Sequence, residues 1–344
     1  MHRSWTLLAV FLLLSACKTK KQELTQVFIL QGETMGTYFN VRYSSREPTA
    51  SKVEIDSLLI DLNQEVSTYI PTSTISLINS QHQESLSLNR DTALHFINNY
   101  LLSEEMYDLS DHYFDPTLNP LVNFWGFGYE ERASAQKDTS LILELLQLVS
   151  FEKWNHSESS DDLYSITKPA GASLDFSAIA KGYGVDLVGE YLSSKGIENW
   201  FVDIGGEVRS LGSKPANKPW VIGVNHPSEK AGVKEADYFL NISDRAVATS
   251  GNYRNYYTEN GVTFSHTINP FSGMTERSNL LSASIVHKSC ARADAAATAC
   301  MVMGLEKSKT WISSLSDYEA FLIFRNQGGE METWKSIGFD FILN

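Results

Sequence analysis

The 344-residue sequence predicts an α+β fold in which mixed or antiparallel sheets pack against a few long helices. Apolar residues recur at helical spacing in several long segments, whereas short strand-like runs dominate the second half of the chain. The two kinds of segment do not alternate regularly, as they would in a parallel α/β fold. Because no strong linker divides the chain, we expect a single domain after the N-terminal segment.

The N-terminal segment is predicted to be a lipoprotein leader and a tether. Trp5–Leu14 is an apolar run of signal-peptide length, far shorter than the roughly 20 residues that a membrane-spanning helix needs. Small residues precede Cys17, as in a bacterial lipobox, which implies cleavage before Cys17 and attachment of a diacylglyceryl group to its thiol. An ordinary signal peptide that ends near a cysteine is the alternative. The predicted organisation is therefore a signal peptide at residues 1–16, a lipidated tether at 17–24 and a domain at 25–344.

The composition indicates a globular protein that does not bind nucleic acid. Hydrophobic residues make up 42% of the chain, enough for a sizeable core. The net charge of -13 argues against a nucleic-acid partner, because phosphate contacts need clustered lysine and arginine. A predicted helix would separate Cys290 from Cys300 by about 15 Å, whereas disulfide-bonded Cα atoms lie within about 7 Å. We therefore expect two buried thiols, with no disulfide and no zinc site.

The first half of the chain is predicted to contain two strands followed by helices. The strands are Gln26–Leu30 and Thr37–Tyr43, around a turn at residues 32–36. Pro71 keeps the preceding loop out of any helix. The polar segment 155–162 is predicted to be a surface loop. Helical spacing of apolar residues predicts helices at residues 53–66, 92–109 and 139–149.

The second half is predicted to be rich in strands, with two helices. A strand at Ser173–Phe176 leads into a helix at residues 178–194, with Gly196 as its C-cap. An alanine-rich helix follows at residues 291–303. The other predicted strands are residues 201–204, 220–224, 238–242, 246–249, 264–268, 281–287 and 321–324.

The alanine-rich helix carries a candidate metal site. Asp294 and Thr298 are four residues apart, so they share one helix face. The surrounding alanines would leave room for a ligand to approach the backbone. A carboxylate and a hydroxyl suit magnesium, which keeps several waters and also takes substrate phosphates. The alternative is a tightly packed alanine-rich helix with Asp294 as a surface charge.

The segment Asp175–Gly184 is a candidate anion site. Ser177 is a good N-cap residue, and Lys181 lies in the first turn of the predicted helix. Free amides at a helix start, together with a nearby ammonium, can hold a phosphate group. An ordinary amphipathic helix is the alternative.

Other candidates are His266 and a scattered set of residues suited to a flat ring. His266 lies at the end of a predicted strand, before the Asn269-Pro270 turn, where it could act as a general base or be a structural histidine. Met35, Tyr69 and the Phe114-Asp115 pair offer apolar or aromatic surface beside an acid.

In their order along the chain, these segments resemble the ApbE family of flavin transferases (FAD:protein FMN transferases). Each motif is weak alone, but their shared order from about residue 31 to residue 304 is specific. The matching segments are Met35-Gly36-Thr37, Ser67-Thr68-Tyr69 with Ser73 and Ile75-Ser76, Asp115–Gly128, Asp175–Gly182, Asp203–Glu207, Ser250–Tyr253, Ser265–Gly273 and Ala293–Ala299.

The resemblance implies an ApbE-like, T-fold-related catalytic domain that binds FAD and Mg²⁺. His266 and Asp294 would be catalytic, with His266 assisting deprotonation of the acceptor. The implied metal ligands are the side chains of Asp294 and Thr298 and the backbone carbonyl of Ala178. The residues implied at the FAD site are Met35, Tyr69, Asp115, Asp175 and Lys181, with Phe114 and Ile268 contributing through neighbouring atoms.

Four positions depart from the family pattern. Asn269 stands where aspartate is frequent, and Ser272 where threonine is frequent. Lys181 and Ala297 occupy positions at which some members carry acids, so the charge around the metal would differ. These departures affect individual ligands more than the resemblance itself.

The implied reaction moves FMN from FAD to a threonine hydroxyl of an acceptor protein through a phosphoester bond, with release of AMP. Two alternatives stay open: an FAD pyrophosphatase, which forms FMN and AMP, and a non-catalytic FAD-binding lipoprotein. Retention of Asp294, Thr298 and His266 favours an enzyme, because storage needs neither metal nor base. The resemblance further implies acceptors among membrane redox-complex subunits that display a threonine. It also implies a lipid-anchored position in the bacterial cell envelope, facing the periplasm.

Overall fold

An eight-stranded antiparallel sheet forms the centre of the fold. The structure is a computed structural model, and it describes residues 25–81, 85–129, 140–159, 162–225, 236–251, 256–259, 262–275, 278–339 and 342–343. The predicted leader and tether, with Cys17, lie outside the described residues. In spatial order, the strands are β1 (Gln26–Thr34), β2 (Thr37–Ser45), β6 (Trp200–Ile204), β7 (Glu207–Leu211), β10 (Ala246–Gly251), β13 (Leu280–His287), β14 (Glu319–Arg325) and β15 (Met331–Lys335).

Three small antiparallel sheets surround the large one. One joins β11 (Tyr256–Glu259) to β12 (Val262–Ser265). The other two are β16 (Ile342–Leu343), β9 (Ala236–Asn241) and β8 (Val221–Asn225), and β3 (Ser85–Asn89), β5 (Leu163–Thr167) and β4 (Asn155–Glu158).

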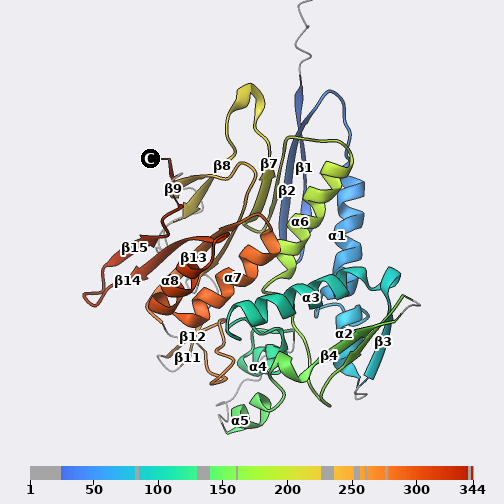
Figure 1. The fold of residues 1–344 in the computed structure, drawn as a ribbon, viewed down its shortest axis with the longest axis vertical. Helices are drawn as coiled ribbons and strands as arrows, with labels where there is room; N and C mark the ends of the chain where they lie inside the picture. Colours follow the sequence, from blue (N-terminus) through green and yellow to red (C-terminus); the bar gives the residue numbers. More distant parts are fainter. Residues whose placement is uncertain are drawn as a thin grey trace, which may run out of the picture.

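Two helices, α6 (Ala180–Ser194) and α7 (Cys290–Met303), lie side by side against one face of the large sheet (Figure 1). Short 3₁₀ turns lie at residues 90–92, 116–118, 151–153 and 215–217. The other helices are α1 (Lys52–Val66), α2 (Thr74–Ser80), α3 (Leu94–Leu109), α4 (Asn119–Trp125), α5 (Leu141–Leu146) and α8 (Leu305–Ser314). Among the described residues, no helix is long and apolar enough to cross a membrane.

Both faces are buried along the central strands of the large sheet, and successive side chains of a strand divide between the two faces. In β6, Trp200 and Val202 join the core under α6, whereas Phe201 joins a second core under β8 and β9. In β14, Leu322 and Ile323 divide in the same way between the helical side and the small-sheet side. The α+β prediction, with antiparallel sheets and packed helices, is therefore confirmed.

The predicted helices are confirmed with small changes at their ends. The predicted helix 92–109 begins at Leu94, after a 3₁₀ turn, and 139–149 shortens to Leu141–Leu146. The alanine-rich helix begins at Cys290. Its Cys290 and Cys300 are buried and not disulfide-bonded, as expected.

The surface loop predicted at residues 155–162 is wrong for Asn155–Glu158, which form the strand β4, and residues 160 and 161 lie outside the described residues. This strand pairs with β5 at the edge of its sheet, and all four of its side chains are exposed. An edge strand without a buried face lacks the apolar alternation that reveals a strand in a sequence.

The predicted strand Ser173–Phe176 is also wrong, since this segment pairs with no strand among the described residues. The Asn79 side chain makes two hydrogen bonds to the backbone of Leu174. Its Nδ2 donates to the Leu174 carbonyl and its Oδ1 accepts from the Leu174 amide, each at 2.8 Å. The amide of Asp175 donates to the Pro116 carbonyl. The segment is thus held in an extended form by loop contacts, not by a sheet.

Four boundary predictions are corrected. Ser177 is not the N-cap of α6, since Ile179 occupies that position and the helix begins at Ala180. At the other end, Lys195 is the C-cap and Gly196, with φ +77°, follows it. The turn predicted at residues 32–36 is confined to Met35 and Gly36. The strand predicted at 264–268 is Val262–Ser265, although Ile268 forms an isolated bridge with Thr275.

Candidate active site

One cleft of about 1830 Å³ collects residues from both halves of the chain. It is bordered by residues of β2, β6, β7, β8 and β10, by the first turn of α6 and by α7. Every predicted site residue except Cys17 lines it. These residues are Met35, Tyr69, Phe114, Asp115, Asp175, Ala178, Lys181, His266, Ile268, Asp294 and Thr298.

The helices α6 and α7 bring Lys181 and Asp294 together. The Gly182 amide donates to Asp294 Oδ2 at 3.0 Å, and Lys181 Nζ lies 3.7 Å from Asp294 Oδ1. One helical turn further along α7, the Thr298 hydroxyl lies 3.3 Å from that of Ser250. The predicted sharing of one helix face by Asp294 and Thr298 is consistent with their common position at the cleft.

The alanines of α7 do not leave open space, contrary to one sequence interpretation. Ala293, Ala295 and Ala297 are fully buried, and the small residues let α6 approach closely. A Cβ atom at Gly182 would lie 2.4 Å from the Cys290 carbonyl oxygen, so only glycine fits there. The alternative interpretation was right about tight packing, but Asp294 is not a surface charge, because it is only 2% exposed.

Asp294 and the partly exposed Lys181 lie beside a buried acid that sequence reasoning did not single out. Lys181 Nζ lies 2.9 Å from Oε1 of Glu207, which is 5% exposed. Burial raises the pKa of Asp294 to about 7, against the opposing effect of the Lys181 ammonium. Burial alone would lower the pKa of Lys181, but Asp294 and Glu207 outweigh it and raise that pKa. Glu207 was visible in the sequence only as the acid after a Gly-Gly pair.

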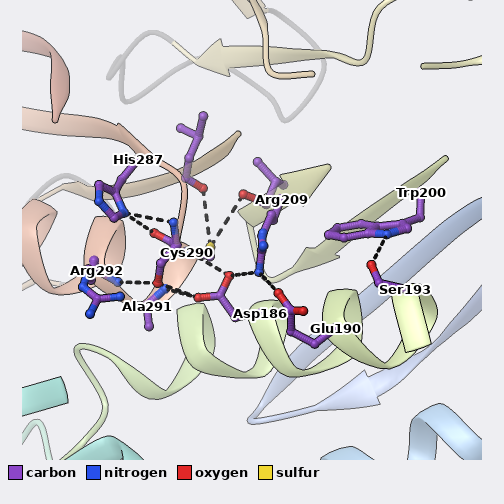
Figure 2. Close-up of polar contacts among 12 residues, drawn as sticks. Asp186, Glu190, Ser193, Trp200, Arg209, His287, Cys290, Ala291 and Arg292 are labelled. Atoms are coloured by element: carbon purple, nitrogen blue, oxygen red, sulfur yellow. Dashed lines mark hydrogen bonds and ion pairs between the residues drawn. The ribbon is translucent and has the colours of Figure 1, made fainter. Parts of the chain in front are cut away.

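A second acid, Asp186 of α6, fixes the start of α7 (Figure 2). Its carboxylate accepts hydrogen bonds from the Ser289 hydroxyl at 2.7 Å and from the amides of Cys290 and Ala291 at 2.9 and 3.0 Å. Arg209 Nη1 lies 2.9 Å from Asp186 and 2.9 Å from Glu190. Asp186 therefore satisfies the free amides at the N-terminus of α7 and aligns the helix that carries Asp294.

Two further acids line the cleft, and in each of them one carboxylate oxygen already accepts hydrogen bonds. Asp115 Oδ1 accepts from the amide and hydroxyl of Thr117 at 2.8 and 2.6 Å. Asp175 Oδ1 accepts from the amide and hydroxyl of Ser177 at 2.7 and 2.5 Å, which explains why Ser177 does not cap α6. Burial raises the pKa of Asp115 to about 6 and also raises that of Asp175.

The apolar and aromatic residues of the predicted site differ in their solvent exposure. Tyr69 is 64% exposed and lies edge-on to Tyr129 at 6.5 Å between ring centroids. Phe114 and Ile268 are only 2% and 3% exposed, so their side chains belong mainly to the core. Tyr69 is thus the aromatic ring among them that is open to a ligand.

His266 follows β12, lines the cleft and lies edge-on to Phe127, with 6.4 Å between the ring centroids. The Asn-Pro turn beyond it is confirmed. Asn269 Oδ1 accepts from the amides of Phe271 and Ser272 at 2.9 and 3.2 Å. An aspartate carboxylate could accept the same two hydrogen bonds, so the presence of asparagine instead of aspartate at position 269 preserves the turn.

The predicted magnesium ligands are hard oxygen donors that line one cleft. The Gly182 amide, which would normally pair with the Ala178 carbonyl, donates to Asp294 instead. Within the described parts of the chain, no backbone amide donates to that carbonyl. Nor does any group of three His, Cys, Asp or Glu side chains suited to a metal occur among the described residues. The set therefore fits only an ion that keeps water ligands, as magnesium does.

Comparison with known proteins gives a consistent result. The model of the ApbE family matches residues 35–322. An FAD:protein FMN transferase of Vibrio cholerae is 33% identical over 341 residues, which cover 96% of each chain. One from Haemophilus influenzae is 30% identical and covers 93% of this chain and 92% of its own.

Solved structures agree with these relatives. The flavin transferase ApbE from Vibrio cholerae superposes with a TM-score of 0.81 at 30% identity, covering 93% of this chain and 100% of its own. The apo form of the Pseudomonas stutzeri flavinyl transferase ApbE gives a TM-score of 0.79 at 30% identity, covering 92% and 96%.

Proposed function

This chain belongs to the ApbE family, and we propose that it is a transferase that moves FMN from FAD to a hydroxyl group of an acceptor protein. The observation that carries the proposal is the convergence of the motif residues, separated by up to some 260 positions in the chain, on one cleft. The names of relatives that match nearly the whole chain support the same activity.

In the proposed reaction, the oxygen of an acceptor threonine attacks the phosphorus of the FMN half of FAD. A new P–O bond forms, the pyrophosphate P–O bond breaks, and AMP leaves with the electron pair of that bond. The threonine proton passes to a base, for which His266 in the lining of the cleft is our candidate. Positioning and charge neutralisation carry most phosphoryl-type transfers.

Different side chains of the cleft would bind different parts of FAD. Tyr69 offers an exposed ring face to a flat heterocycle. Asp115 and Asp175 can accept hydrogen bonds from hydroxyl and N–H groups of the nucleotide. Lys181 lies beside Asp294, where its ammonium would balance phosphate charge.

We propose that Asp294, Thr298 and the Ala178 carbonyl hold Mg²⁺. The bound ion would supply further neutralisation of the pyrophosphate. The free Ala178 carbonyl and the buried Asp294 support this set.

We also propose that Cys17 is lipidated and anchors the protein to a membrane of the bacterial envelope, facing the periplasm. The natural acceptors would be membrane redox subunits that display a threonine. The lipobox-like sequence before Cys17 supports the anchor.

The experiment incubates the purified protein with FAD and Mg²⁺, with and without an acceptor domain that displays such a threonine. AMP is measured by chromatography, and acceptor-bound flavin by fluorescence in a denaturing gel. We expect labelled acceptor and matching AMP, both lost in Asp294→Ala. AMP without labelled acceptor would instead indicate an FAD pyrophosphatase, and FAD binding with neither product would indicate a binding protein.

A further inference from the structure

Lys181 lies between two buried carboxylates at unequal distances. Its Nζ atom is 2.9 Å from Glu207 Oε1 but 3.7 Å from Asp294 Oδ1. The first distance is that of a charge-assisted hydrogen bond, whereas the second is too long for one. The ammonium is therefore bound to Glu207 and only attracted by Asp294.

The backbone fixes the position of Glu207. This residue begins β7 and pairs with Ile204 across the two-residue turn Gly205-Gly206. Both glycines have positive φ, +63° and +104°, and a Cβ atom at Gly205 would lie 2.7 Å from Thr37. The tight turn fixes the backbone of Glu207 beside β2. The residue is only 5% exposed, so its carboxylate is enclosed by the cleft.

The Glu207 carboxylate is poorly satisfied for its burial. Only Oε1 is engaged, whereas Oε2 is buried without a hydrogen-bond partner among the described residues. The carboxyl groups of Glu207 and Asp294 share the single Lys181 ammonium, so one negative charge is left over when both are ionised. A buried excess of negative charge is costly unless a cation compensates it.

Asp294 has one oxygen available for such a cation. Its Oδ2 atom accepts from the Gly182 amide at 3.0 Å, while Oδ1 makes no hydrogen bond to Lys181 at 3.7 Å. If Glu207 lost its charge, the long Lys181 side chain could move onto Oδ1 and occupy the place of the metal.

We propose that Glu207 is a positioning residue that holds the Lys181 ammonium away from Asp294 and so keeps the Asp294 carboxylate free for a divalent cation. This inference rests on the proposed function, because it assumes that Asp294 is a metal ligand. In this arrangement, Glu207 binds the fixed Lys181 ammonium, and the exchangeable divalent cation binds to the adjacent carboxylate of Asp294.

The test titrates Mn²⁺, a paramagnetic substitute for Mg²⁺, into the purified protein without FAD and follows free Mn²⁺ by electron paramagnetic resonance. The variants are Glu207→Gln, Lys181→Met and the double variant. Glu207→Gln should weaken Mn²⁺ binding by about 10- to 100-fold, as removal of a supporting residue around a metal ligand does. Adding Lys181→Met should restore the affinity, because the competing ammonium is gone.

The double variant separates competition from simple loss of charge. If Glu207 acted only by long-range attraction, Lys181→Met would change Mn²⁺ affinity by the same factor with or without Glu207. Competition predicts a much larger gain in the Glu207→Gln background, and equal factors would overturn the proposal. Glu207→Asp, which keeps the charge, should retain more Mn²⁺ affinity than Glu207→Gln, and melting temperatures check that each variant folds.

Two further outcomes distinguish this inference from the proposed function. Normal Mn²⁺ binding by Glu207→Gln would overturn the role of Glu207 and leave the transferase assignment intact. A wild-type protein that transfers FMN but binds no Mn²⁺ at the Asp294 site would overturn both the metal assignment and this inference.

Discussion

Asp115 is a buried acid whose charge opposes folding. Burial outweighs the two hydrogen bonds from Thr117 and raises the pKa of Asp115 from 3.8 to about 6. Below the lower value the group is protonated in both the folded and unfolded states and costs nothing. Above the higher value it is ionised in both states, and the shift corresponds to a cost of about 3 kcal/mol. Stability is therefore lost as the pH rises between these two values.

Asp115→Asn should remove this cost while keeping an oxygen for the Thr117 hydrogen bonds. We expect a higher melting temperature than wild type at about pH 8, but little difference at about pH 4. Thermal unfolding at both pH values measures the effect, with exposed Asp91→Asn as the control. Equal shifts at the two pH values would contradict a cause in the ionisation of Asp115.

Replacement of Asp294 should reduce activity without reducing stability. Its burial raises the pKa to about 7, so the carboxylate does not favour folding at neutral pH. Asp294→Asn should lower FMN transfer by at least about 100-fold, because loss of an outer-shell partner already costs about 10- to 100-fold and Asp294 would be a direct ligand. The melting temperature should stay equal or rise, because Asn can still accept from Gly182. A variant that lost activity together with stability would argue for a structural role instead.

Among the elements, the junction of α6 and α7 holds the site together. Asp186 caps α7 from the neighbouring helix. Asp186→Ala should lower the free energy of unfolding by about 1–2 kcal/mol through the lost cap. Glu190→Gln is a matched control, since Glu190 pairs with the same Arg209 but its side chain is 67% exposed. The control should change stability by less than about 0.5 kcal/mol in chemical denaturation.

The close approach of the same two helices depends on Gly182. Gly182→Ala places a methyl group against the Cys290 carbonyl and should cost about 1–3 kcal/mol by overpacking. It should also weaken Mn²⁺ binding, because the Gly182 amide orients Asp294.

Gly184→Ala serves as the control in the same helix. Its nearest contacts are at 3.3 Å or more and belong to the flexible side chains of Leu62, Ile204 and Met35. The gain in helix propensity, about 1 kcal/mol, offsets this crowding. Equal melting temperatures for the two variants would contradict the close-packing account.

At the scale of the whole molecule, the sequence predicted best what is local. The helix α7 was found because it is rich in alanine, and the strands β1 and β2 because they are rich in strand-forming residues around a short turn. The strand β4 was missed because its side chains are all exposed. Local pattern alone does not reveal an element that is stabilised mainly by its neighbours.

The same contrast between local patterns and long-range contacts holds for the residues of the site. The motif residues were predictable because their chemistry is visible in short segments, and all of them in the described chain line the cleft. Asp186 and Glu207 were missed because their partners lie far away in the sequence, more than 100 positions in the contact of Asp186 with Ser289. Only the folded structure brings such charges together.

The most direct test of the account is the intact mass of an acceptor domain after incubation with this protein, FAD and Mg²⁺. We predict a mass increase of one FMN on the wild-type acceptor and none when its threonine is replaced by valine. The increase should also be absent with the Asp294→Asn enzyme. An acceptor of unchanged mass in the presence of accumulating AMP would contradict transfer, and a modified valine variant would contradict attachment to the threonine hydroxyl.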